Sequence, residues 1–184
     1  GSYKVKDTAA QLAAASASLL SDQTIVINDT NTASDTTRLN TIQTKMVSNG
    51  GNGTVTYAKL TDSATNLAAN TDDIVAGVAV TIDDTNNTAA TVAELNDIQT
   101  AVSGAAGASL TYTKLRDSSA NIRANTANGS ITDVEGIAVT VTTTSNASQF
   151  SAILTAATAN NANGTVAGAV SNAVGNLTNV TLTG

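Results

Sequence analysis

The sequence contains no cysteine, proline, histidine or tryptophan, and it has a single phenylalanine. The absence of cysteine excludes disulfides and thiolate chemistry, and the absence of histidine removes the commonest general base of enzymes. With almost no aromatic side chains, a core must be assembled from Val, Ile, Leu and Ala, which favours thin and regular layers. Only 12% of the 184 residues are charged, about half the usual fraction, so the surface is polar but largely uncharged.

Charge and hydropathy exclude further classes of function. The net charge of −6 argues against nucleic-acid binding, because contacts to phosphates need clustered Lys and Arg. No apolar run reaches about 18 residues, so no membrane insertion is predicted. The two glutamates, Glu94 and Glu135, lie far apart in the sequence, and neither sits beside a paired carboxylate. A protein that is not an enzyme is therefore predicted.

A four-residue motif, apolar–x–Asp–Thr/Ser, recurs along the chain at fixed intervals. Its aspartates are Asp7, Asp29, Asp62, Asp84 and Asp117, spaced 22, 33, 22 and 33 residues apart. A sixth copy has Thr143 in place of the aspartate. Two alternating units, odd (Asp7, Asp62, Asp117) and even (Asp29, Asp84, Thr143), thus form a repeat of 55 residues. A fixed period of this length indicates stacked structural units that share one continuous core.

Each copy of the motif ends a segment that alternates between apolar and polar residues, a pattern typical of a strand with one buried face. The position two before the aspartate is always apolar: Val5, Ile27, Leu60, Ile82, Leu115 and Val141. After the motif, the apolar residues fall at helical spacing among good helix formers, as in Leu39 and Ile42 or Leu95 and Ile98. Each unit is therefore predicted to be a strand, a helix and a return loop.

Units of this kind must join parallel strands through right-handed crossovers. The expected fold is an α/β solenoid of about six strand-helix turns, with a parallel sheet on one side and helices on the other. This layout is that of leucine-rich repeats, without their sequence signature. The chain, 1–184, is predicted to be a single repeat domain. Its repeats are 3–56, 57–111 and 112–163, followed by a degenerate terminal turn at 164–184 that ends in a strand at 180–182.

The aspartates of the motif have two interpretations. Asp, Ser and Thr at the start of a helix accept hydrogen bonds from its free N–H groups, so the repeated Asp-Thr/Ser step is predicted to cap the helix that follows. Alternatively, the five aspartates stack in register about 4.8 Å apart along a parallel ladder and bind calcium. No calcium-binding loop signature accompanies them, and capping is favoured. Asp83 and Asp84 are the best candidates for a calcium ion, and no other cofactor is indicated.

The outward face of the predicted sheet carries most of the basic residues. Lys4, Lys59 and Lys114 recur at the 55-residue period, Lys6 and Arg116 each lie one residue before a motif aspartate, and Tyr57 and Tyr112 are nearby. One interpretation of such a basic and aromatic stripe is a binding face for an acidic surface polysaccharide. A plainer interpretation is that the lysines keep an exposed strand soluble and discourage edge pairing. Threonines also line this face, but the lysines interrupt the regular grid that binding to ice requires.

The segment Val5-Lys6-Asp7-Thr8-Ala9-Ala10-Gln11-Leu12 and its copy from Leu60 to Leu67 carry a family resemblance. They resemble the V-x-D-T-A-x-N-L tandem repeats of giant secreted bacterial surface and adhesin-like proteins, and the resemblance covers about residues 1–158. It implies an extracellular or cell-surface location and a structural or adhesive role, with neighbouring repeats or other copies of the chain as partners. The loss of the aspartate at Thr143 departs from the pattern.

The resulting hypothesis is a structural repeat segment, a stalk or scaffold that can stack end to end into filaments. Three alternatives remain open: a carbohydrate- or surface-binding module that uses the lysine and tyrosine face, a calcium-stiffened adhesin repeat, and a phage fibre of the same architecture.

Overall fold

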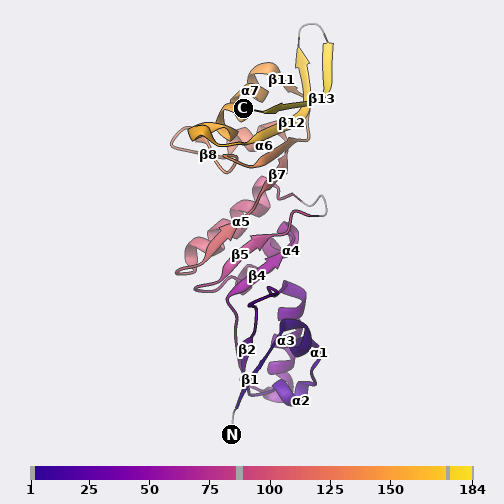
Figure 1. Ribbon diagram of the computed structural model, residues 1–184, viewed down its shortest axis with the longest axis vertical. Helices are drawn as coiled ribbons and strands as arrows, with labels where there is room; N and C mark the ends of the chain where they lie inside the picture. The colour runs from indigo at the N-terminus through magenta and orange to yellow at the C-terminus, as the bar shows by residue number, and fades with distance from the viewer. Residues whose placement is uncertain (1–2, 86–88, 173–174, 184) are drawn as a thin grey trace. The chain divides into compact units, whose positions relative to one another are not determined.

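The computed structural model describes residues 3–85, 89–172 and 175–183 (Figure 1). It is a mixed α/β structure with several parallel sheets, which confirms the predicted class and the parallel strand pairing. The chain forms two compact units. Unit 1 comprises Gly1–Asp62, Asn66–Ile82 and Asp97–Thr111, and unit 2 comprises Ser63–Thr65, Asp83–Asn96 and Tyr112–Gly184.

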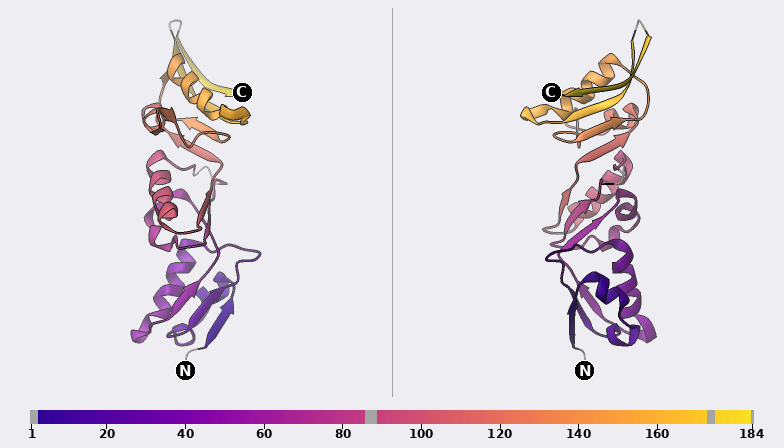
Figure 2. Two further views of the ribbon diagram at one scale, coloured as in Figure 1. Left: turned by 90° about the vertical axis from the view of Figure 1, so that its left-hand side faces the viewer. Right: turned by 45° about the vertical axis from the view of Figure 1, so that its right-hand side comes forward.

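Unit 1 contains two three-stranded parallel sheets. The first is formed by β1 (Lys4–Asp7), β2 (Thr24–Ile27) and β3 (Thr54–Thr56). In the sequence, the connections between these strands contain α1 (Ala9–Ala14), α2 (Ala17–Leu20), α3 (Thr36–Met46) and the 3-10 turn η1 (Ser48–Gly50). Figure 2 shows the helices α1 to α3 on one side of this sheet.

The second sheet of unit 1 consists of β4 (Lys59–Asp62), β5 (Ala79–Ile82) and β6 (Ser109–Thr111), all parallel. Its connections contain α4 (Ala64–Ala69), the 3-10 turn η2 (Thr71–Asp73) and α5 (Val92–Gly104), and both helices contribute residues to the two units. The extended segment 54–62 serves both sheets, because β3 pairs with β2 and β4 pairs with β5. Ser34 also bridges to Leu60, so residues that follow β2 continue alongside β4.

Unit 2 is built around β7 (Lys114–Asp117), β10 (Ala138–Val141) and β12 (Thr165–Asn172), which are parallel. The short strand β11 (Ser145–Asn146) also pairs with β12. The helices of this part are α6 (Ser119–Ala124) and α7 (Ala147–Ala157), and η3 (Ala159–Asn161) follows α7. A small antiparallel hairpin, β8 (Thr126–Ala127) and β9 (Ser130–Ile131), lies between α6 and β10.

The cores contain the apolar residues whose spacing predicted that they would be buried. Alternate strand residues are buried, as in Ile25 and Ile27 of β2 or Val80 and Ile82 of β5. The helices bury the predicted positions as well: Leu12, Leu39, Ile42, Leu67, Leu95, Ile98, Ile122, Phe150 and Ile153. Helix spacing and strand alternation were therefore predicted correctly.

The register of the strands differs from the expected one by two residues. Val5 lies opposite Ile25, and the same pairing joins Leu60 to Val80 and Leu115 to Val139. The aspartates consequently do not stack: Asp7, for example, lies opposite Ile27. A shift of two residues keeps the same side chains on the buried face, so the alternation is equally satisfied by either register.

Two further strand predictions need correction. Strands β3 and β6 were not predicted as separate strands, although the alternation in Thr54-Val55-Thr56 could have indicated the first. The terminal segment does contain a strand at 180–182, within β13 (Gly175–Thr183). This strand runs antiparallel to β12, however, contrary to the parallel arrangement expected for every turn.

Candidate functional site

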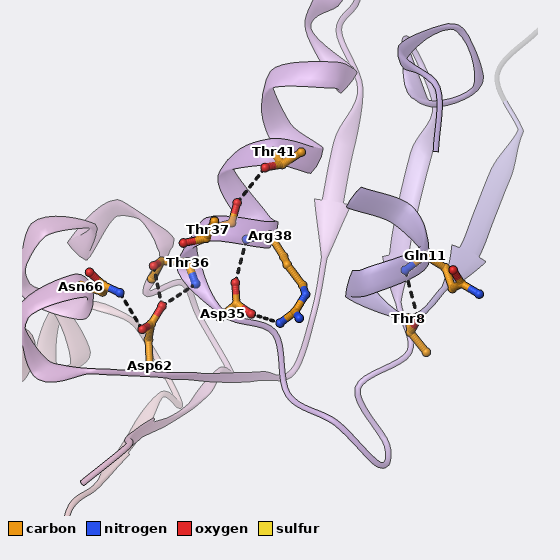
Figure 3. A network of polar contacts seen from close by, with 9 residues as sticks. All are labelled: Thr8, Gln11, Asp35, Thr36, Thr37, Arg38, Thr41, Asp62 and Asn66. Atoms are coloured by element: carbon orange, nitrogen blue, oxygen red, sulfur yellow. Dashed lines mark hydrogen bonds and ion pairs between the residues drawn. The ribbon is translucent and has the colours of Figure 1, made fainter. Parts of the chain in front are cut away.

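The odd aspartates Asp62 and Asp117 bond to the first turn of a helix that precedes them in the sequence. Asp62 Oδ2 accepts from the N–H of Thr36 at 3.0 Å and from its hydroxyl at 2.6 Å (Figure 3). Asp117 Oδ2 accepts from the N–H of Val92 at 3.0 Å. Thr36 and Val92 are the first residues of α3 and α5, where N–H groups lack partners within the helix. Each carboxylate thus joins its strand to the helix of the previous turn.

The other oxygen of these two carboxylates bonds to the short helix that follows. Oδ1 of Asp62 accepts from the amide of Asn66, and Oδ1 of Asp117 accepts from the amide of Asn121, both at 2.8 Å. Both asparagines lie in the helix immediately after their aspartate, α4 and α6 respectively. One carboxylate therefore connects a strand, its own helix and the helix of the previous turn, which restricts all three elements.

The even aspartates make a different contact, to the backbone of the next turn. Asp29 Oδ2 accepts from the N–H groups of Ala58 and Lys59 at 2.6 and 2.7 Å. Asp84 Oδ2 accepts from the N–H groups of Thr113 and Lys114 at 2.8 and 3.0 Å, and from the Thr113 hydroxyl at 2.9 Å. Asp29 and Asp84 are only 8% and 6% exposed. Buried carboxylates with several N–H donors form strong, oriented hydrogen bonds.

The predicted capping of the following helix is performed by the neighbouring residue. Thr8 is the N-cap of α1, with its hydroxyl accepting from the N–H of Gln11, and Ser118 plays the same role in α6. Asp7 accepts from the N–H of Thr8 at 2.8 Å and is exposed. In these two copies the Asp-Thr/Ser step therefore caps the following helix through its Thr or Ser, and neither Asp7 nor Asp117 is the N-cap residue. Asp7 and Asp117 are the last residues of β1 and β7, and the helix begins two residues later, so the hydroxyl of the residue between is at the N-cap position.

Thr143 retains one function of the motif without a carboxylate. Its hydroxyl accepts from the N–H of Ser119 at 3.0 Å, and Ser119 is the first residue of α6. In this even unit a hydroxyl therefore makes the contact to a helix N-terminus that carboxylates make in the odd units.

The register and the hydrogen bonds also remove the basis of the calcium ladder. The described residues contain no cluster of three or more carboxylates that could hold a metal ion. Asp83 accepts from the N–H and hydroxyl of Thr85 at 3.0 and 2.6 Å, while Asp84 is directed toward Thr113 and Lys114. These neighbouring aspartates thus serve two separate hydrogen-bond groups.

The three periodic lysines are exposed. Two of them contact the loop that follows an even strand. Lys59 Nζ lies 3.4 Å from the carbonyl oxygen of Thr30, and Lys114 Nζ donates to the carbonyl oxygen of Asp84 at 2.9 Å. These ammonium groups therefore help to hold successive turns together while they remain open to solvent.

The tyrosines do not share the exposure of the lysines. Tyr57 and Tyr112 are half-buried, and the Tyr57 hydroxyl donates to the carbonyl oxygen of Asp73. The Tyr112 hydroxyl donates to Asp133 at 3.4 Å. Burial raises the pKa of both tyrosines, and nearby Asp73 and Asp133 raise it further. Their hydroxyls are engaged inside the fold, so the lysines and tyrosines form no common exposed stripe.

Asp73, a further acidic residue, has a raised pKa. Asp73 is buried and accepts from the amide of Gln43 at 3.0 Å. Burial raises its pKa, the Gln43 hydrogen bond lowers it, and the charge of Asp72 raises it. No signal in the sequence distinguished Asp73 from an ordinary turn residue.

Glu94 forms a capping box with Thr91 at the start of α5. Its Oε2 accepts from the N–H and hydroxyl of Thr91 at 2.9 and 2.8 Å, and its Oε1 accepts from the Thr65 hydroxyl at 2.7 Å. Burial raises the pKa of Glu94, but the hydrogen bonds from Thr65 and Thr91 outweigh burial and lower it. The Thr-x-x-Glu spacing could have indicated this cap.

An open groove of about 690 Å³ lies in unit 2 between the hairpin region and α7. Its two acidic residues are already bonded to amides: Asp133 accepts from Asn125 at 2.9 Å, and Glu135 accepts from Asn160 at 3.2 Å. The remaining lining is mainly alanine, threonine and serine. None of the described helices is long and apolar enough to cross a membrane.

Comparisons with protein-family models, curated protein sequences and solved structures find no significant match.

Proposed function

We propose that this chain is a non-enzymatic structural segment of an extracellular bacterial surface protein, whose role is to provide a stable spacer or scaffold. The observation that carries the proposal is that the most regularly repeated polar residues form hydrogen bonds between turns. Asp29, Asp62, Asp84 and Asp117 all bond to backbone N–H groups of an adjacent turn. Residues that recur at a fixed period therefore connect turns and do not converge on a pocket.

The finer architecture we propose is the α/β solenoid of about six strand-helix turns. Two features support it: the parallel pairing of odd with even strands, and the extended segment 54–62, which pairs with β2 at one end and β5 at the other. In such an array each turn covers the apolar face of its neighbour, so stability and length both increase with the number of turns. The surface location rests on the resemblance to secreted tandem repeats.

A spacer must resist extension, and single-molecule pulling between the two chain termini tests this property. We expect discrete force peaks as groups of turns unfold. A full repeat of 55 residues releases about 190 Å of extended chain. A chain that extends smoothly, without force peaks, would refute the spacer function.

A second candidate function is binding of an acidic polysaccharide, which the exposure of Lys4, Lys59 and Lys114 favours. Affinity electrophoresis through a gel containing an acidic polysaccharide tests it. Binding at this face predicts retardation that is lost when all three lysines are replaced by alanine and retained in Arg123→Ala, because Arg123 is an exposed cation of α6. Equal retardation of the three proteins, each measured against its mobility in a gel without polysaccharide, would eliminate this candidate.

A further inference from the structure

The outer edge of β1 is an unoccupied edge of a parallel sheet. Among residues 3–85, 89–172 and 175–183, β1 pairs only with β2. On the β2 side, the carbonyl oxygens of Tyr3 and Asp7 accept from Thr24 and Asn28 at 3.2 and 2.8 Å. Successive residues of a parallel strand direct their backbone groups to opposite edges. The N–H and C=O groups of Lys4 and Lys6 therefore face the open edge.

The corresponding edges of the two later odd strands are occupied. In β4, the Lys59 carbonyl oxygen accepts from the N–H of Ser34 at 3.2 Å, and the Thr61 N–H donates to the Ser34 carbonyl oxygen at 2.8 Å. In β7, the Arg116 N–H donates to the Ala90 carbonyl oxygen at 2.8 Å. Lys59, Thr61 and Arg116 are the counterparts of Lys4 and Lys6 in the repeat. The structure thus contains two examples of what fills this edge.

The carboxylate of Asp7 likewise uses only one of its two oxygens as a hydrogen-bond acceptor among the described residues. Its Oδ1 accepts from Thr8, as Oδ1 of Asp117 accepts from Ser118, at 2.8 and 2.6 Å. Oδ2 of Asp117 goes on to bind the first N–H of α5, whereas Oδ2 of Asp7 has no partner among the described residues. Asp7 thus presents a free oxygen where its counterparts bind a helix N-terminus.

Apolar side chains are also more exposed in the turn that contains β1 than at the equivalent positions of later turns. Leu60 and Leu115 are fully buried, whereas Val5, their counterpart in β1, is only half-buried. Tyr3 is 52% exposed and Leu19 is 42% exposed. The turn that contains β1 therefore lacks the cover that an adjacent turn gives to the later copies.

We propose that the outer edge of β1 is the docking surface for one further repeat of this same kind, which precedes Tyr3 in the polypeptide. The inference rests on the proposed function as an array of turns. The docked repeat supplies the first N–H of its long helix to Asp7 Oδ2 and a backbone pair to Lys4 and Lys6. Its even aspartate accepts from the Lys4 N–H. The Tyr3 N–H already donates to Gln23 Oε1 at 2.7 Å and is left in that bond.

In its described residues, a second copy of the chain offers no free N-terminus of a long helix to Asp7. The first N–H groups of α3 and α5 are already bonded to Asp62 and Asp117. The remaining long helix, α7, has a complete capping box formed by Asn146 and Gln149. The edge of β12 away from β10 is covered by the antiparallel β13. Among the described residues, the long-helix N-termini that Asp7 would require and the outer edge of β12 are therefore already in use.

The proposal is tested by extending the full chain with a second copy of residues 57–112 placed directly before Tyr3, so that the native spacing between units is kept. Amide hydrogen exchange is measured at Lys4 and Lys6 in the original and extended chains. We expect fast exchange in the original chain and slowing on the order of 100-fold in the extended one. Unchanged exchange would overturn the proposal, because the appended sequence is one that folds within the chain.

Asp7→Asn provides the matched variant. The asparagine oxygen still accepts from the Thr8 N–H, but its amide group replaces the free oxygen. We expect a loss of roughly 3–6 °C in Tm in the extended chain and a change below about 1 °C in the original one. Equal effects in both chains would contradict the proposed contact.

Protection of Lys4 and Lys6 that appears in the original chain only at high concentration would instead assign the edge to a second copy and overturn the proposal. None of these outcomes alters the force peaks of the original chain, so failure of the docking inference is distinguishable from failure of the spacer function.

Discussion

Replacing Asp29 by alanine is expected to separate two adjacent turns of unit 1. The substitution removes the acceptor shared by the N–H groups of Ala58 and Lys59. These residues lead into β4, so the loss falls at the point where the chain passes from the first sheet to the second. The aspartate is 8% exposed, so water enters only if the turns move apart.

The magnitude follows from the two hydrogen bonds. A hydrogen bond to a charged group contributes about 1.5–3 kcal/mol, and contributions that share one acceptor are not additive. Part of the gain is offset by the cost of burying the carboxylate. We therefore expect Asp29→Ala to lower the free energy of unfolding by about 3 kcal/mol, and Tm by about 6–12 °C for a chain of this size.

Asp29→Asn separates the loss of charge from the loss of the acceptor. The asparagine oxygen can take the place of Oδ2, and Oδ1 makes no hydrogen bond among the described residues, so the amide group can stand there. We expect this variant to lose about half as much stability as the alanine variant. Asp97→Asn, at an exposed position of α5, is the control and is expected to change the unfolding free energy by less than about 0.5 kcal/mol.

The assay is urea unfolding followed by circular dichroism, with the slope of the transition compared between variants. An unchanged slope with a lower midpoint identifies a change in stability alone. If Asp29→Ala unfolds at the same urea concentration as Asp97→Asn, the carboxylate does not hold the turns together and the reasoning is refuted.

Four further predictions concern other positions. Burial raises the pKa of Tyr57 and Tyr112, so both stay protonated in the folded chain at a pH near 10, where tyrosines of the unfolded chain ionise; the stability of the fold therefore falls as pH rises beyond that value. Replacing both with phenylalanine should leave the absorbance titration of the folded protein near pH 10 unchanged. A smaller absorbance change in the variant would contradict their burial. Hydrogen bonds lower the pKa of Glu94, so its contribution to stability is fully present above the pKa of the unfolded chain and is lost as pH falls through the pKa of the folded chain. The Tm difference between wild type and Glu94→Gln should therefore shrink in acid. A Tm difference that stays constant with pH would refute the stabilising role of the Glu94 carboxylate. Thr143→Asp should raise the unfolding free energy by about 0.5 kcal/mol, because it places a negative charge at the N-terminus of α6, and a loss of stability in urea would count against that contact. Millimolar calcium should leave Tm unchanged relative to chelator, whereas a rise of many degrees would support the calcium-stiffened alternative.

The sequence predicted the features that depend on periodicity. The burial of Leu39 and Ile42 in α3, and the burial of Ile25 and Ile27 in β2, follow from helical and strand spacing. The parallel direction follows from the length of the units, which is too great for hairpins. These properties are local or depend only on chain length, so one sequence is sufficient to predict them.

The candidate site depended on register, which periodicity leaves undetermined. Val5 pairs equally well with Ile25 or Ile27 as far as burial is concerned, but only the second pairing would stack Asp7 on Asp29. The observed register moves Asp29 beyond the end of β2, from where it bonds to Ala58 and Lys59, about 30 residues away in sequence. Contacts of this separation depend on how two turns meet.

The position of Tyr57 also could not be predicted from the spacing of residues along the chain. Tyr57 lies between β3 and β4, where the chain leaves one sheet and enters the next, and its hydroxyl donates to Asp73. The alternation of the flanking residues placed it on the outward face, but the break between the two strands changes its direction. A change of strand at Tyr57 was not visible in a pattern that treats 54–62 as one segment.

Four of the motif aspartates, Asp29, Asp62, Asp84 and Asp117, each hold a particular neighbouring turn, and residue-resolved amide hydrogen exchange in Asp29→Ala and Asp84→Ala tests this most directly. We expect a separate loss of protection in each variant: at Ala58 and Lys59 in the first, and at Thr113 and Lys114 in the second. This expectation would be contradicted if these four amides exchanged rapidly in the wild type, or if each variant affected both pairs alike.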